Sequence, residues 1–217
     1  MKNNSNELIG IMLLTFSLLF SCATAPETQQ EMKIPIVDAG YFTVEPPYDV
    51  LPYYSVWSCQ VNKELGAVRF EKGKYSVLGG WVGSTLIQVF RNGVKQEGWH
   101  LSEEEVANDF RDQEENIMRL EGGTKNEYKL KDVKKDITTI GEKKLYFMSY
   151  KISTPFKLIG GGKIINAALY LYFPPEFKEN HIFYGFLFSE SHATGALVTF
   201  DVKVIYPVIN SLKIKNP

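Results

Sequence analysis

The sequence has few of the residues from which catalytic and metal sites are usually built. Of its 217 residues, two are cysteine and three are histidine. It has no Gly-x-Ser-x-Gly motif, no His-Glu-x-x-His motif and no closely spaced cysteine pair, so neither a hydrolase elbow nor a zinc site is predicted. Glu179 with His181, and Glu190 with His192, offer two metal ligands each, and a site would need a third from elsewhere. We therefore expect no catalytic residue, no cofactor and no metal.

The chain also lacks an excess of charge of either sign. Its 24 Lys and Arg residues oppose 25 Asp and Glu residues, which gives a net charge of −1. Nucleic-acid-binding proteins usually carry a basic face, so nucleic acid is not an expected partner. With 44% hydrophobic and 23% charged residues, the composition is that of an ordinary globular protein.

The apolar run Leu8–Phe20 is too short to span a bilayer but suits the hydrophobic region of a signal peptide. It ends in Leu19-Phe20-Ser21-Cys22, which resembles the lipobox of bacterial lipoproteins. This resemblance implies cleavage before Cys22 and acylation of Cys22, so residues 1–21 are expected to be a signal peptide. An uncleaved signal anchor is the alternative.

The residues after Cys22 set the expected location. Ala23, rather than Asp, follows the cysteine, which resembles lipoproteins sorted to the outer membrane of a two-membrane bacterium; a one-membrane host is the alternative. Residues 22–32 are polar after the cysteine and predict a flexible tether. Two or three acyl chains would hold the protein on the membrane, since each buried methylene adds about 0.8 kcal/mol. We therefore expect an extracytoplasmic protein anchored to the membrane by lipid on Cys22.

Acylation of Cys22 would leave Cys59 without a disulfide partner in the chain. Cys59 follows Val56-Trp57-Ser58, and a lone cysteine in such a sequence is expected to be a small buried residue rather than a nucleophile. A papain-like site would also need histidine and orienting partners, which the spacing does not suggest.

Residues 33–64 form a segment rich in proline and aromatic residues. Proline at this density is incompatible with a helix or a central strand, so we expect an extended arm. The arm could present aromatic anchors to a protein partner, because aromatics contribute strongly at interfaces. We favour the alternative that the arm drapes over the domain and buries its rings. The candidate partner-binding residues are Tyr48, Tyr53, Tyr54 and Trp57.

Two helices are predicted in the remaining domain, residues 65–217. Ser102 and Glu105 form a capping box before an apolar stripe of helical spacing, and Gly122-Gly123 is expected to end this helix. A second helical stripe near the C-terminus contains Pro207. That helix is either kinked there or begins near Tyr206, with the proline in its first turn.

Strands are expected in the rest of the domain. Both alternating sets of residues are apolar in Ala167–Phe173 and in Ile182–Phe188, which predicts strands covered on both faces. The mixed charges of Lys129–Asp136 predict an exposed edge strand. The candidate strands are Val68–Glu71, Ser84–Arg91, Tyr128–Val133, Lys144–Ser153, Lys163–Phe173 and His181–Ser189.

This order of elements predicts an α+β fold, a twisted antiparallel sheet of about six strands with a helix on each face. The order, together with the C-terminal run Tyr206–Leu212 (YPVINSL), resembles the PsbP-like fold, an α/β/α sandwich of photosystem II extrinsic subunits and small periplasmic lipoproteins. The resemblance implies a non-catalytic accessory domain that binds or stabilises a membrane complex. It implies no active-site residues.

The sequence therefore predicts a lipid-anchored extracytoplasmic binding protein, with the membrane and an envelope protein complex as partners, and not an enzyme. One alternative is a carrier of a small ligand or lipid, which would be favoured if the tyrosines of Lys163–Phe173 lined a pocket between sheet and helix. The other is an enzyme whose site brings His181 and His192 together with carboxylates.

Overall fold

The computed structural model describes residues 36–47, 57–75, 81–93, 102–125, 129–153, 163–193 and 200–215. The signal peptide and tether predicted over residues 1–32 lie outside these ranges, as do Tyr48, Tyr53 and Tyr54. Within them, no helix combines the length and apolarity that a membrane crossing requires. Residues 35–217 form one compact unit.

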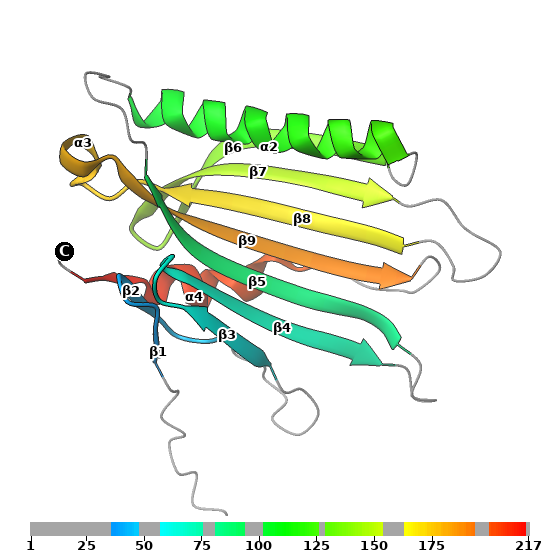
Figure 1. The fold of residues 1–217 in the computed structure, drawn as a ribbon, viewed down its shortest axis with the longest axis horizontal. Helices are drawn as coiled ribbons and strands as arrows, with labels where there is room; N and C mark the ends of the chain where they lie inside the picture. Colours follow the sequence, from blue (N-terminus) through cyan, green and yellow to red (C-terminus); the bar gives the residue numbers. More distant parts are fainter. Residues whose placement is uncertain are drawn as a thin grey trace, which may run out of the picture. The chain divides into compact units, whose positions relative to one another are not determined.

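The unit is built mainly from a seven-stranded antiparallel sheet with the strand order β3-β4-β5-β9-β8-β7-β6 (Figure 1). The predicted antiparallel sheet is thus confirmed, although about six strands were expected. All six candidate strands are present, most of them longer than predicted. The strands are β3 (Ser58–Asn62), β4 (Ala67–Tyr75), β5 (Trp81–Gly93), β6 (Lys129–Ile140), β7 (Lys143–Ser153), β8 (Lys163–Tyr172) and β9 (Ile182–Ala193).

The central strands β8 and β9 carry apolar side chains on both faces, as predicted. Neighbouring residues of a strand point to opposite faces, and in β8 Ala168 and Tyr170 belong to one core cluster while Ala167 and Leu169 belong to another. The first core cluster contains Phe42, Val68, Phe70, Ile87, Val89, Ala168, Tyr170, Phe186, Phe188, Ile205, Val208 and Ile209, among others. The second contains Val106, Ala107, Tyr146, Met148, Tyr150, Ala167, Leu169, Leu171, Phe173, Phe177 and Phe183, among others.

Helix α2 (Glu103–Lys125) runs alongside β6 and β7 (Figure 1). The predicted capping box forms: Ser102 N donates to Glu105 Oε2 (2.7 Å) and Glu105 N donates to Ser102 Oγ (3.3 Å). The bonds that Ser102 N and Ser102 Oγ donate to the Glu105 carboxylate lower the pKa of that carboxyl. The predicted stop at Gly122-Gly123 is wrong, because the helix continues to Lys125. Glycine costs only about 1 kcal/mol in a helix interior and does not forbid helical dihedrals.

Arg111 anchors the middle of α2 to the sheet. Its Nη1 donates to the carbonyl oxygens of Phe147 (2.9 Å) and Asp136 (3.1 Å), and its Nη2 donates to Asn108 Oδ1. Only 5% of Arg111 is exposed. Burial lowers the pKa of the guanidinium, which keeps its charge nevertheless.

The C-terminal segment begins with a 3-10 turn, η1 (Val202–Ile205), which leads directly into helix α4 (Tyr206–Ser211). Pro207 lies in the first turn of α4, where its missing N–H removes no helical hydrogen bond. The second of the two predicted alternatives is therefore correct. Ile205, Val208 and Ile209 are fully buried in the first core cluster.

Strand β6 is an edge of the large sheet, as its charges predict. Its register with β7 shifts between Lys131 and Lys134, and Asp132 has a positive φ of 53° there. Such a bulge, together with exposed lysines, protects an edge from pairing with another chain.

The expected boundary at residue 65 differs from the structure, because part of the arm belongs to the folded unit. Strand β3 pairs with β4 from Ser58↔Glu71 to Asn62↔Ala67, so residue 65 lies in a hairpin turn. A second, unpredicted sheet joins β1 (Val37–Asp38), β2 (Phe42–Val44) and β10 (Lys213–Ile214) in the order β1-β2-β10. Phe42 and Val44 are buried in the first core cluster. The described part of the arm is therefore extended, as predicted, but is a component of the domain.

Candidate functional site

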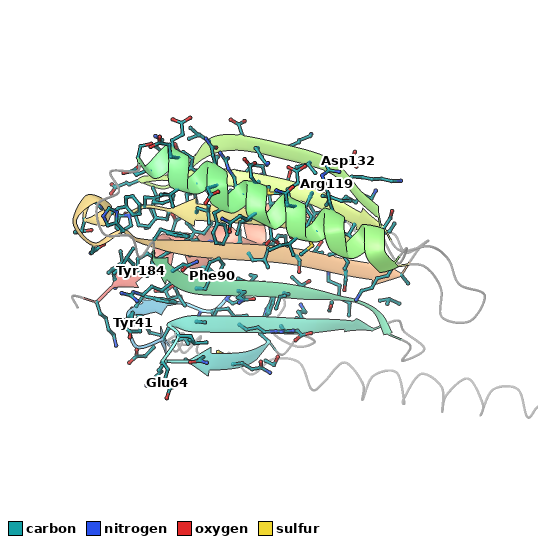
Figure 2. All side chains as sticks on the ribbon, turned by 45° about the horizontal axis from the view of Figure 1, so that its top comes forward. Tyr41, Glu64, Phe90, Arg119, Asp132 and Tyr184 are labelled. Atoms are coloured by element: carbon teal, nitrogen blue, oxygen red, sulfur yellow. The ribbon has the colours of Figure 1, made fainter. Side chains whose placement is uncertain are left out.

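A hollow of about 180 Å³ lies where the small sheet meets the ends of β5 and β9. Short helix α3 (Phe177–Asn180) and the residues before it form another wall. Figure 2 shows Tyr41 and Tyr184 at this end of the domain. We call it the Arg91 hollow; it is lined by Tyr41, Arg91, Pro174, Glu176, Asn180, Ile182, Tyr184, Ile214 and Lys215.

Arg91 is held in a fixed position in this hollow. Its guanidinium carbon lies 4.3 Å from the centre of the Tyr41 ring, a distance at which a cation is attracted to the ring face. Its backbone N donates to Gly66 O at 2.9 Å. Gly66 has a φ of +60°, and a Cβ on it would lie 2.9 Å from Tyr41 Cδ2 and 3.2 Å from Arg91 Cβ. Glycine at 66 is what allows the tyrosine to pack beside the arginine.

Tyr184 forms part of the floor of the hollow and is 3% exposed. Burial raises the pKa of its hydroxyl, while a hydrogen bond from Arg91 acts in the opposite direction. The phenol therefore stays protonated at neutral pH.

Lys215 closes the hollow from the small sheet. Its Nζ donates to Asp38 Oδ1 at 2.7 Å, and its backbone N donates to Tyr41 O at 2.9 Å. The hydrogen bonds from Lys215 and from Gly40 lower the pKa of the Asp38 carboxyl. The positive charge of Lys215 is thus balanced within the protein, and the pair is exposed enough that it contributes little to stability.

Arg91 and Glu176 carry the unbalanced charges of the hollow. Among the described residues, neither forms an ion pair, with each other or with another side chain. Both nevertheless act electrostatically on Tyr184. The hollow thus presents a cation from β5 and a carboxylate from the α3 side, together with apolar surface from Ile182 and Ile214.

A second polar cluster lies near the other end of β9. Lys74 Nζ donates to Glu190 Oε1 at 2.6 Å, and Thr85 Oγ1 donates to the same oxygen at 3.2 Å. Glu190 is 5% exposed, and its Oε2 has no hydrogen-bond partner among the described residues. Thr85 lies opposite Glu190 in the β5–β9 ladder. The carboxylate therefore depends on Lys74 as its described counterion.

Trp57 is the one candidate partner-binding residue that the structure describes. It is half-buried and packs against the first core cluster, with Lys72 Nζ 5.9 Å from its ring centre. Its Nε1 is buried and has no hydrogen-bond partner in the described part of the chain. Tyr48, Tyr53 and Tyr54 lie outside the described residues.

The expectation of a buried Cys59 is wrong. Cys59 is exposed on β3, an edge strand whose five residues are all exposed. Because β3 has a neighbouring strand on one side only, the sheet does not enclose the Cys59 side chain. Its contact with the domain still raises the pKa of the thiol through desolvation, which disfavours the nucleophilic thiolate.

The two histidines that an enzyme site would need do not converge. His181 caps α3 just before β9, and His192 lies near the far end of that strand. Eleven residues of extended chain separate them by roughly 36 Å. Within the described ranges, no three His, Cys, Asp or Glu side chains are grouped as metal ligands.

The tyrosines of β8 do not line the Arg91 hollow. Tyr170 is 2% exposed and hydrogen-bonded to Tyr206, and burial raises the pKa of its hydroxyl. Tyr172 packs against the first core cluster. Sequence reasoning missed Arg91, Tyr41, Tyr184 and Lys215, because they come from four distant segments and share no motif.

No protein-family model matches the chain, and a search of curated proteins finds no match.

Proposed function

We propose that this chain is a lipid-anchored, extracytoplasmic binding protein that supports a membrane or envelope protein complex. The observation that carries the proposal is the lipobox-like Leu19-Phe20-Ser21-Cys22 at the end of a short apolar run. A compact unit that starts at Pro35 leaves a short linker after the cysteine. The predicted tether, ten residues after Cys22, would extend on the order of 17 Å root-mean-square as a flexible chain, so the domain would work close to the membrane.

In a host with two membranes, we place the protein in the outer membrane, facing the periplasm. Ala23 after Cys22 is the feature that favours this location. The anchor would come from two or three acyl chains on the cysteine, since a single chain gives only marginal binding. With a net charge of −1, the protein would gain little from attraction to anionic lipid.

We further propose that the domain is a PsbP-like α/β/α sandwich. In support, Val106 and Ala107 of α2 pack with Ala167 and Leu169 of β8 in the second core cluster. Val208 and Ile209 of α4, with Ile205 of η1, pack in the first core cluster, where the other face of β8 contributes Ala168 and Tyr170. The fold resemblance implies an accessory role without catalysis.

For the protein partner we propose a surface on the aromatic arm that includes Tyr48, Tyr53 and Tyr54, with Trp57 as a support rather than a free anchor. The half-buried position of Trp57 against the core favours that division of roles. Trp57 is already packed against the core, so it would lose little conformational entropy on binding, which favours affinity.

In-cell crosslinking, followed by purification from membranes, tests this surface. We expect a stoichiometric protein partner with the wild type and its loss with Tyr53→Ala/Tyr54→Ala. Ile137→Ala is the matched control, because Ile137 is an exposed apolar residue (45%) on the opposite edge strand β6. A partner retained by the double variant would rule out the aromatic surface, and the absence of any protein partner would rule out the accessory role.

A second candidate function is the transport or sensing of a small ligand. The Arg91 hollow favours it, because it combines polar groups with apolar walls in one concave site. Its volume of about 180 Å³ lies below the roughly 300–1,000 Å³ typical of sites for drug-sized molecules. A ligand of this hollow would therefore be small, and a whole lipid would not fit.

A further inference from the structure

The geometry of the Arg91 hollow points to a small amphoteric ligand, one that carries a carboxylate and an ammonium group as an amino acid does. This inference rests on the small-ligand function proposed above and names the class of ligand. It starts from two opposite charges, Arg91 and Glu176, that line one hollow and do not pair with each other.

The ligand's carboxylate belongs at Arg91. The guanidinium is already held by the Tyr41 ring at 4.3 Å and by its bond to Tyr184, so little side-chain entropy is lost when it binds an anion. Its planar set of donors matches a carboxylate. Tyr184, which also interacts with Arg91, lines the same hollow. The Tyr41–Arg91–Tyr184 arrangement is thus a preorganised carboxylate site.

The ligand's ammonium group belongs at Glu176. This carboxylate lies on the α3 side of the hollow, and its negative charge contributes to raising the pKa of Tyr184. A ligand with a carboxylate at both ends would place one of them against Glu176, at a cost in like-charge repulsion. Lys215 does not change this balance, because its charge is already paired with Asp38. The hollow therefore selects a ligand with one charge of each sign.

Beside its two charged groups, the ligand is expected to carry a short apolar side chain. Pro174, Ile182 and Ile214 line the same hollow as the charged groups, and Ile214 is 39% exposed. Burial of an aliphatic side chain against them removes apolar surface from water and so favours binding. Leucine and similar amino acids fit this description better than polar ones.

The test is calorimetric titration of the full chain, purified from membranes in detergent, with each standard amino acid. We expect an aliphatic amino acid such as leucine to bind best. N-acetyl-leucine lacks the ammonium group and leucinamide lacks the carboxylate, so each is expected to bind at least tenfold more weakly, as charged hydrogen bonds are worth about 1.5–3 kcal/mol.

Variants locate the site. Arg91→Gln is expected to abolish leucine binding and Glu176→Gln to weaken it about tenfold. Lys213→Gln and Glu64→Gln, exposed charges outside the hollow, are the controls and are expected to bind normally. Glu176 is exposed, so its variant folds even if Arg91→Gln does not, and circular dichroism checks both.

Three outcomes would overturn the inference. Equal binding of leucine, N-acetyl-leucine and leucinamide would mean that the charges do not select the ligand, although a carrier role would stand. If Glu176→Gln and Arg91→Gln both still bind leucine, the ligand binds elsewhere. If no amino acid binds, the amphoteric class is wrong, whereas membrane anchoring and partner capture are measured independently and are not affected.

Discussion

Replacement of Lys74 by alanine is expected to destabilise the domain by about 2–4 kcal/mol. The substitution leaves the Glu190 carboxylate, with a side chain 7% exposed, without its described counterion. Removal of one partner of a buried pair typically costs about 3–5 kcal/mol. The expected loss is smaller here, because the Lys74 side chain is 28% exposed and water can partly replace its ammonium group.

Glu190→Gln is the matched control for this prediction. It removes the other charge, keeps the shape of the side chain, and leaves a lysine that can reach water, so it is expected to cost about 1 kcal/mol. The double variant Lys74→Ala/Glu190→Gln is expected to be more stable than Lys74→Ala alone. Equilibrium urea unfolding measures all three. If Lys74→Ala costs less than Glu190→Gln, the pair does not act as described.

Gly185→Ala is expected to cost about 1–3 kcal/mol, the usual range for an overpacked site. Gly185 is buried in β9, opposite Phe90 of β5. A Cβ on Gly185 would lie 2.1 Å from Phe90 Cζ. The ring cannot move away freely, since it stacks on Phe110 of α2 at 6.1 Å and Phe110 in turn packs edge-on against Phe183 at 5.5 Å. The glycine therefore makes room for the aromatic contact between α2 and the sheet.

Gly93→Ala separates this steric effect from the general effect of replacing a glycine. Its nearest contact would be His181 O at 3.5 Å, an ordinary van der Waals distance, and its variant is expected to lie within about 0.5 kcal/mol of the wild type. Phe90→Ala/Gly185→Ala should be less destabilised than the sum of its single changes. If urea unfolding gives Gly185→Ala and Gly93→Ala the same free energy of unfolding, the position of the Phe90 ring does not require a glycine at residue 185.

Local signals in the sequence were sufficient where a few neighbouring residues determine the structure. Ser102 and Glu105 mark the start of α2 through bonds that they make with each other. Pro207 restricts the start of α4 to its own turn. The doubly apolar pattern of Ala167–Phe173 requires cover on both faces, and β8 lies third from one edge of the sheet.

Pairing between distant segments was not predictable in the same way. Strand β3 (SCQVN) is wholly exposed, so it shows no apolar alternation. Strand β2 pairs with β10 between residues about 170 positions apart, Thr43↔Lys213, and strands of two or three residues are too short for a periodicity to be detected. The Arg91 hollow depends on this pairing, because β10 leads into Lys215. A site assembled this way follows from tertiary structure alone.

The lipid anchor on Cys22 is the central claim, and metabolic labelling with an alkyne analogue of palmitate tests it most directly. The chain contains one other cysteine, Cys59, which provides a matched control. We predict that the wild type and Cys59→Ala incorporate the label and remain in the membrane fraction, whereas Cys22→Ala does neither. A wild-type chain without label, or label that persists in Cys22→Ala, would contradict the account.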